Sequence, residues 1–231
     1  MGIDGIAAAT DDELFVKALQ EISAEDGSVP CLVALHGRPT RYVFEPAAQL
    51  LACEEPTERE LGARVLRELG PYDSEGRRPF TAETIEIVVA EMADEPDPCV
   101  LGWMISALGH HNAEETLDLV LGHQWDPAQP VRFAVAAALP DLADREHTQD
   151  RVVEALLELA EDGNEAVRWY ALCALFNETA GITDEQKIAW ATALAERGDT
   201  ERRAQLRHLG TALDDHADSA LRDALEQAQD V

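Results

Sequence analysis

Two stretches of the chain place an aromatic residue directly after an arginine. Phe133 follows Arg132, and Trp169 follows Arg168 thirty-six residues later. Aromatic rings and arginine are enriched among the side chains that carry most of the binding energy at protein interfaces. The two pairs therefore indicate a surface that binds a protein partner. An alternative is that the rings pack against neighbouring helices and contribute only to the core.

Helical spacing predicts which residues around these pairs are buried. Apolar residues recur at i, i+3, i+4, i+7 and i+8, which is one face of a helix. The predicted buried sets are Val131, Ala134, Val135, Ala138 and Leu139, and Val167, Tyr170, Ala171, Ala174 and Leu175. The residues expected on the other faces are Arg132, Phe133, Ala136 and Ala137, and Arg168, Trp169, Leu172, Cys173 and Phe176. We expect partner contacts from Arg132, Phe133, Arg168, Trp169, Phe176 and, on a later helix, Arg203.

Other combinations that could do chemistry are weak in this sequence. His110 and His111 are adjacent, so on a helix their side chains point about 100° apart, and no cysteine lies at a zinc-like spacing from them or from His123. No glycine-rich phosphate loop, nucleophile elbow or HExxH motif is present. We therefore expect no metal site, no cofactor and no enzymatic activity.

The two arginine–aromatic stretches are copies of one longer theme. Residues 126–139 and 162–175 each begin with an acidic turn, continue with Val-Arg and end in an Ala-rich helix. Self-similarity at a period of this size indicates a repeat solenoid. The theme resembles the HEAT repeat, and more closely the short bacterial HEAT-like repeats that also occur in phycobilisome lyases. The resemblance implies an all-α solenoid of about five or six helix pairs, with Phe133 and Trp169 side by side on its concave surface.

Weaker copies extend this resemblance in both directions. One copy begins at residues 95–100 and has Leu101 in place of the arginine. An earlier copy covers residues 55–70, with a register uncertain by one residue. A later copy, near residues 196–210, keeps Arg202. In the later copy, Arg203 replaces the aromatic residue. We therefore expect one domain over residues 1–231, made of a degenerate N-terminal cap (1–54), repeats (55–210) and a C-terminal capping helix (211–231).

The two central arginines also have a structural interpretation. Arg132 and Arg168 each lie six residues after an aspartate, Asp126 and Asp162 respectively. Each arginine can reach back across its turn or to the acid of the neighbouring repeat. The resemblance favours such a ladder over a role in ligand binding, and a partly buried pair of this kind would fix the angle between repeats. Leu101 would interrupt the ladder.

Several local signals predict helix boundaries. Thr10 or Asp11 should cap a first helix, and Thr81 should cap a helix that reaches about residue 93. Capping boxes are expected at residues 112–115 and 183–186. Pro46 falls inside a helical pattern and lacks an amide donor, so we expect a kink or a split near it.

The charge of the chain is unusual. There are 46 acidic against 18 basic residues, which gives a formal net charge of −28. This disfavours nucleic acids and anionic lipids, which attract basic surfaces. A basic protein partner is the better electrostatic match, because opposite charges steer association. Alternatively, the acids only keep the surface soluble, or they reflect a source that lives in high salt.

Cysteine usage and the N-terminal residues bear on localisation. Four cysteines, at positions 31, 53, 99 and 173, lie in apolar helical contexts and are expected to be reduced and buried. The chain starts without the pattern of a secretory signal, and no apolar stretch is long enough to span a membrane. We expect a cytoplasmic protein, and the abundance of alanine and arginine suggests a bacterium with a GC-rich genome.

Three functions follow as expectations. The first is a non-enzymatic scaffold or adaptor that binds a protein partner, which the charge suggests is basic, on its concave face. The alternatives are an immunity-type inhibitor of a basic toxin and an enzyme resembling the HEAT-like bilin lyases, which attach tetrapyrroles to cysteines of a client. The charge argues against a HEAT-like DNA glycosylase, and the absence of any His-Glu dipeptide excludes the di-iron hydroxylase branch of the family.

Overall fold

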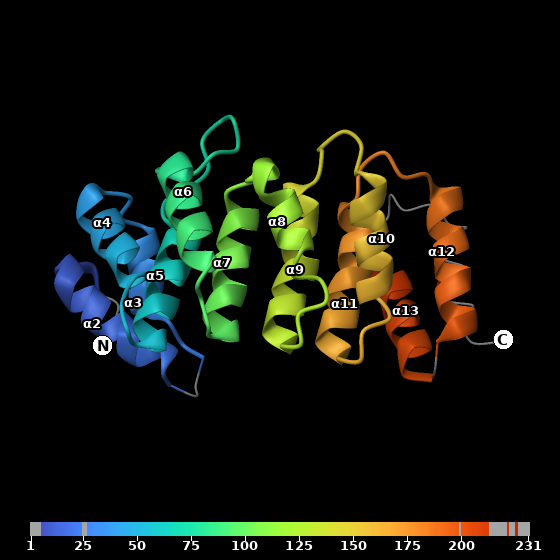
Figure 1. Cartoon of the computed structure of the whole chain (residues 1–231), viewed down its shortest axis with the longest axis horizontal. Coiled ribbons are helices and arrows are strands. Elements are labelled where there is room, and N and C mark those ends of the chain that lie inside the picture. Colours follow the sequence, from blue (N-terminus) through green and yellow to red (C-terminus); the bar gives the residue numbers. More distant parts are fainter. Residues whose placement is uncertain (1–5, 25–26, 199, 213–220, 222–224, 226–231) are drawn as a thin grey trace. The chain divides into compact units, whose positions relative to one another are not determined.

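The computed structural model describes residues 6–24, 27–198, 200–212, 221 and 225. Every regular element of this part of the chain is a helix, which confirms the prediction of an all-α fold (Figure 1). Internal contacts divide the chain into two units, Met1–Thr116 and Leu117–Val231. The single domain expected for residues 1–231 stays a prediction. The expected capping helix at residues 211–231 falls almost entirely outside the described residues.

The described part of the first unit contains six α-helices of seven residues or more. These are α2 (Asp11–Ile22), α3 (Pro30–His36), α4 (Arg41–Leu50), α5 (Pro56–Glu68), α6 (Thr81–Met92) and α7 (Pro98–His110). Helix α5 is central, because it packs against α2, α3, α4 and α7. The approach of α4 to α5 requires a glycine, since a Cβ atom on Gly62 would lie 2.6 Å from the carbonyl oxygen of Ala47.

Two predicted helix starts in this unit are wrong. Helix α6 begins at Thr81 itself, after Phe80 in a left-handed conformation with φ 60°. Asn112 also has a positive φ of 49°, and its amide donates to the carbonyl oxygen of Gly76, so it does not cap a helix. A single 3-10 turn, Glu114–Thr116, follows it. At Asn112 a loop contact therefore outweighs the local capping signal.

Two other helix starts were predicted correctly. The hydroxyl of Thr10 accepts from the amide of Glu13 in a complete capping box, and Thr183 does the same with Gln186. Pro46, in contrast, lies within the continuous helix α4, so the predicted split is wrong. The proline removes the helical donor for the carbonyl of Tyr42, and this residue lies on the solvent-facing side with 82% of its surface exposed.

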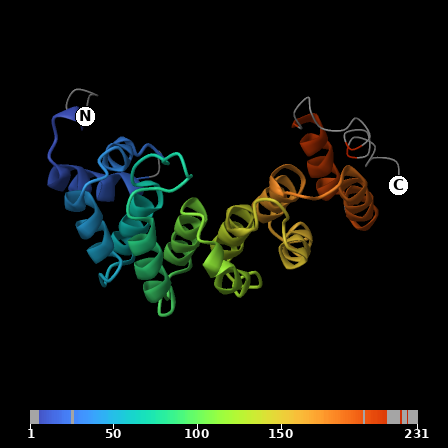
Figure 2. The same cartoon turned by 90° about the horizontal axis from the view of Figure 1, so that it is seen from above.

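The second unit begins with the short helix α8 (Leu117–Leu121). It continues with α9 (Gln129–Leu142), α10 (Asp150–Leu159), α11 (Glu165–Cys173), α12 (Asp184–Arg197) and α13 (Thr200–Ala212). A π-helical turn, η2 (Ala174–Glu178), extends α11. Helix α11 packs against α9, α10 and α13, and Figures 1 and 2 both show α10 beside it. It is therefore the central helix of this unit.

The predicted buried stripes are largely correct. All five predicted residues of α9 are buried, and four of the five on α11 are too, whereas Tyr170 is 44% exposed. The residues predicted off the stripe but found buried are Ala136, Arg168, Leu172 and Phe176. Helix α11 has neighbours on more than one side, so its buried surface is wider than one stripe. The wider π turn also changes the register of Phe176.

Candidate functional site

Arg132 links the turn before α9 to the equivalent turn of the next repeat, which precedes α11. Its Nη1 donates to the carbonyl oxygens of Asp126 and Pro127, at 2.8 and 3.0 Å. Its Nε and Nη2 donate to the carboxylate of Asp162, at 2.6 and 3.0 Å. Burial alone would raise the pKa of Asp162, but the hydrogen bonds from Arg132 and from the amide of Asn164 outweigh it and lower that pKa. This is the structural ladder that the spacing suggested.

Arg168 makes the same kind of contacts in the next repeat. Its Nη1 donates to the carbonyl oxygens of Asp162 and Gly163, at 2.9 and 3.1 Å. Its Nη2 lies 2.9 Å from the carboxylate of Glu201, and its Nε donates to the side chain of Gln205 at 3.1 Å. The side chain is only 5% exposed. Arg168 therefore joins the turn before α11 to α13.

In the first unit, Arg59 makes the same set of contacts to two turn carbonyls and one carboxylate, which we call an arginine fork. Its Nη1 donates to the carbonyl oxygens of Cys53 and Glu54, at 3.0 and 2.7 Å, and the rest of the guanidinium holds both carboxylate oxygens of Glu95, at 2.7 and 2.8 Å. This fixes the register that the sequence left uncertain by one residue. Leu101, at the corresponding place in the next copy, is buried as an apolar residue.

The aromatic residues expected to form one pair have different neighbours. Phe133 packs against Tyr170, with ring centroids 4.5 Å apart. Trp169 stacks on His208, with centroids 5.2 Å apart and an interplanar angle of 29°. Among the described ring contacts none joins Phe133 to Trp169. Both rings are partly exposed, whereas Phe176 is 2% exposed and is not available to a partner.

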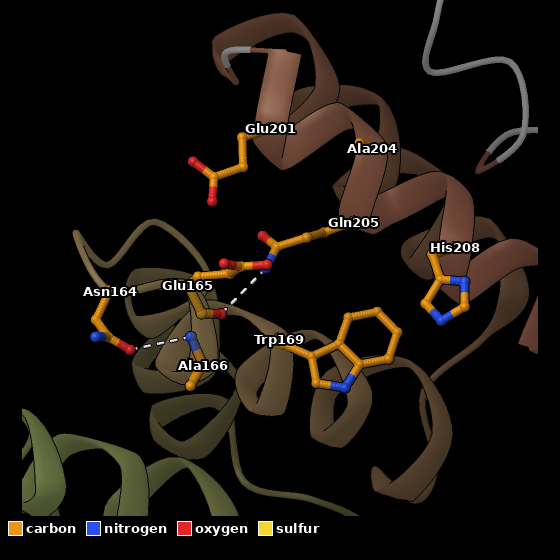
Figure 3. A pocket seen from close by; sticks show the side chains of 8 residues that line it. All are labelled: Asn164, Glu165, Ala166, Trp169, Glu201, Ala204, Gln205 and His208. Carbon is orange, nitrogen blue, oxygen red and sulfur yellow. Dashed lines mark hydrogen bonds between the residues drawn. The ribbon is translucent and has the colours of Figure 1, made fainter.

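A pocket of about 620 Å³ lies beside Trp169, between α11 and α13 (Figure 3). We call it the Trp169 pocket, and its lining residues are Asn164, Glu165, Ala166, Trp169, Glu201, Ala204, Gln205 and His208. Its floor is held in place, because the amide of Gln205 donates to the carbonyl oxygen of Glu165 at 3.1 Å and its oxygen accepts from Arg168. Figure 3 shows Trp169 on α11 and, on α13 facing it, Glu201, Gln205 and His208.

Sequence reasoning found Trp169 but missed the residues around it. Glu165, Gln205 and His208 come from two helices forty residues apart, and the spacing along one helix cannot show that they meet. One signal was available, because Glu165 and Glu201 both lie in the first turn of the second helix of their pair. Arg203, the remaining predicted binding residue, is partly exposed on α13 but does not line this pocket.

The histidines considered as metal ligands have separate backbone partners. His110 Nδ1 donates to the carbonyl oxygen of Ser106 at 3.1 Å, and His111 Nε2 donates to that of Leu66 at 2.9 Å. Burial lowers the pKa of His110 to about 4 and also lowers that of His111. Within the described residues, no group of three or more His, Cys, Asp or Glu side chains could hold a metal ion.

The cysteines and the helix lengths bear on two further expectations. All four thiols are free, as predicted, but only Cys31 is buried. Cys99 is exposed because it lies in the first turn of α7, on the side that faces solvent. Among the described residues, no helix is both long and apolar enough to cross a membrane.

Comparison with known proteins gives matches at the level of structure. No protein-family model and no curated protein sequence matches the chain. The X-ray structure of YibA from Escherichia coli matches with a TM-score of 0.67 and 16% identity, over 90% of this chain and 73% of that one. The complex of CpcE and CpcF of phycocyanin lyase from Nostoc sp. PCC7120 matches with a TM-score of 0.47 and 20% identity, over 93% of this chain and 82% of that one. The match to YibA, together with the repeated turns and arginine forks, shows that the chain has the all-α solenoid fold of HEAT-like repeat proteins.

Proposed function

We propose that this chain is a non-enzymatic binding module, a scaffold or adaptor, whose partner is a protein with exposed basic residues. The observation that carries this proposal is the Trp169 pocket, which a partly exposed indole ring lines together with the side chains of Glu165 and Glu201. A cationic side chain is attracted both to the face of an indole ring and to a carboxylate beside it.

The state of the two carboxylates supports this choice of ligand. Glu201 is already bound by Arg168 at 2.9 Å, although it is 56% exposed. Glu165 is exposed, and its carboxylate has no hydrogen bond or ion pair among those described. An incoming arginine or lysine would therefore find one acceptor available and a second within the same pocket. The fixed positions of Gln205 and Arg168 reduce the ordering that binding requires.

The position and the charge of the site agree with the proposal. Helices α11 and α13 are second helices of their pairs, which the resemblance assigns to the concave face. The net charge of −28 would attract a basic protein and repel nucleic acids and anionic membranes. A cytoplasmic location belongs to the same proposal.

Two other functions remain distinguishable by experiment. An immunity-type inhibitor of a basic toxin would be a special case of the proposed binding and would use the same surface. An enzyme resembling the bilin lyases would bind a tetrapyrrole and change its visible absorbance. A titration that leaves a bilin spectrum unchanged would count against the second function.

The experiment is capture of partners from an extract of the source cell at about 0.15 M salt, where weak charge attraction is screened. The wild type is compared with Trp169→Ala and with Tyr42→Ala, an exposed aromatic residue of the first unit. The proposal predicts one dominant basic protein whose affinity falls about tenfold with Trp169→Ala and is unchanged with Tyr42→Ala. A folded Trp169→Ala protein with full affinity would contradict it, as would a diffuse set of basic proteins removed by modest salt.

A further inference from the structure

A second exposed tryptophan lies on a different part of the second unit. Trp125 follows α8 and is 66% exposed. It lines a pocket of about 630 Å³, here called the Trp125 pocket, whose other residues belong mainly to α10 and the turn after it. The lining comprises Trp125, Glu154, Leu157, Glu158, Leu159, Glu161, Asp162, Gly163 and Arg197. The Trp169 pocket shares none of these residues.

The ring of Trp125 has no internal cation over it. Among the cation–ring contacts described, none involves Trp125. Arg197 lines the pocket, but it is paired with Glu161 at 3.3 Å and donates to the carbonyl oxygen of Ala193 at 3.1 Å. Tryptophan is enriched among the side chains that carry most of the binding energy at protein interfaces.

The acids of this pocket are arranged unfavourably for the chain on its own. Glu154 and Glu158 are one turn apart on the exposed face of α10, where like charges repel. Glu158 also lies in the last turn of the helix, which carries partial negative charge and has no basic residue. Its described partner is the neutral amide of Gln124, at 3.4 Å. A cation bound between these carboxylates would relieve both effects.

The remaining acids of the pocket are already engaged. The carboxylate of Asp162 is held by Arg132, and that of Glu161 by Arg197. Glu154 and Glu158 are therefore the acceptors that an incoming ligand would meet.

In the first unit, one arginine contacts both a tryptophan ring and a glutamate carboxylate. The guanidinium of Arg64 lies over the ring of Trp103, with Cζ 4.6 Å from the ring centroid, and its Nη1 bonds to the carboxylate of Glu60 at 3.0 Å. Arg64, Trp103 and Glu60 thus form a complete set of arginine, tryptophan and glutamate. The Trp125 pocket has the tryptophan and the glutamates, but its own arginine, Arg197, is paired with Glu161 and makes no described contact with the ring.

We propose that the Trp125 pocket binds an arginine side chain presented by a protein partner. The guanidinium would stack on the indole ring of Trp125 and donate to the carboxylates of Glu154 and Glu158. Arginine suits the pocket better than lysine, because its planar group is weakly hydrated and can stack and donate at the same time. This site is independent of the Trp169 pocket, so either proposal can fail without the other.

The probe is hexa-arginine with blocked termini, and its binding is followed by the indole N–H signals of the protein in NMR spectra. The signal of Trp125 is the one that disappears in Trp125→Phe. At about 0.15 M salt, the Trp125 signal should shift and saturate. Capped hexa-citrulline, which is neutral and nearly the same shape, should leave it unchanged. Capped hexa-lysine should bind several-fold more weakly than hexa-arginine.

A matched pair of variants separates the pocket from general charge attraction. Glu154→Gln with Glu158→Gln should weaken binding of hexa-arginine about tenfold. Glu114→Gln with Glu115→Gln changes the net charge equally at two other exposed residues, and should alter the affinity less than about twofold. The spectra also show whether each variant is folded.

Four outcomes would overturn the proposal: an equal loss in both paired variants, an equal response to hexa-citrulline, equal binding of hexa-lysine, or no saturable shift at Trp125. A shift confined to Trp169 would support the proposed function and reject this second site.

Discussion

The guanidinium of Arg132 donates hydrogen bonds to both carboxylate oxygens of Asp162, at 2.6 and 3.0 Å. Asp162 begins the turn of the next repeat. The same carboxylate accepts from the amide of Asn164 at 2.7 Å, just before α11 starts. One ion pair therefore joins α9 to the turn between α10 and α11. Side-chain exposures of 18% and 10% keep most water away from it.

Removal of this arginine should destabilise the second unit. Arg132→Ala leaves Asp162 without its ionic partner and two turn carbonyls without a donor, so we expect the free energy of unfolding to fall by about 2–4 kcal/mol. Arg132→Lys should recover only part of this, since lysine lacks the planar fork. Urea denaturation measures the change.

A matched control is Arg151→Ala. Arg151 is paired with Asp118, and their side chains are 50% and 79% exposed, so its loss should change the free energy of unfolding by no more than about 0.5 kcal/mol. Equal effects of the two substitutions would show that the buried fork contributes nothing specific.

The acids of the Trp125 pocket should reduce stability in the absence of a ligand. Glu154→Gln with Glu158→Gln removes a repulsive pair one turn apart and relieves the C-terminal end of α10. The free energy of unfolding should rise by about 0.2–0.5 kcal/mol at low salt. The gain should shrink as salt is added, because screening weakens the repulsion. A lower stability of this variant at low salt would contradict the prediction.

The four thiols should react at different rates with iodoacetamide in the native protein. Burial, followed by the charge of Asp97, raises the pKa of Cys99, but its side chain is exposed. Cys31 is buried, and burial raises the pKa of Cys173 to about 11. Mass spectrometry should show Cys99 modified at least about tenfold faster than Cys31. Equal rates in the native state would mean that Cys31 is as accessible as Cys99.

The sequence predicted the fold well because a repeat is a local pattern. Val131, Val135 and Leu139 share one helical face, and that face is buried as the spacing required. Arg132 and Asp162 could be matched because the period places them in equivalent turns. The pattern also placed an interruption at Leu101, which is buried.

The candidate sites were much harder to predict. Trp169 meets His208 only through the packing of α11 against α13, and Trp125 lines one pocket with Glu158, which lies on α10. Neither pairing follows from spacing along one helix. Tyr170 was placed in the core by periodicity, yet its ring covers Phe133 at the surface. Contacts of this kind depend on tertiary packing, which periodicity does not encode.

Three histidines of the first unit have lowered pKa values. Burial lowers the pKa of His36, His110 and His111, and the charges of Arg67 and Arg78 act in the same direction on His36 and His110. The negative charge of Glu68 acts to raise the pKa of His36 and His110, because its carboxylate lies 3.8 Å from His36 and 3.6 Å from His110. These rings therefore stay neutral in the folded chain at pH values where they would bind a proton in the unfolded chain.

This difference makes the first unit sensitive to mild acid. A histidine with a lowered pKa contributes stability that is fully present above its unfolded value, near 6.5, and is lost as the pH falls towards the folded value, which is about 4 for His110. Hydrogen exchange, corrected for the intrinsic rates, should show α5 and α7 losing protection between pH 7 and pH 5. His110→Gln should flatten this loss, while His123→Gln, a control in the second unit, should not.

Asp141 and Glu178 in the second unit should act in the opposite direction. Burial raises the pKa of both carboxyls, so protonation favours the folded state and mild acid adds stability there. The three histidines and these two carboxyls should therefore respond to acid in opposite directions. Constant or rising protection of α5 and α7 between pH 7 and pH 5 would show that the three histidines do not control the stability of the first unit.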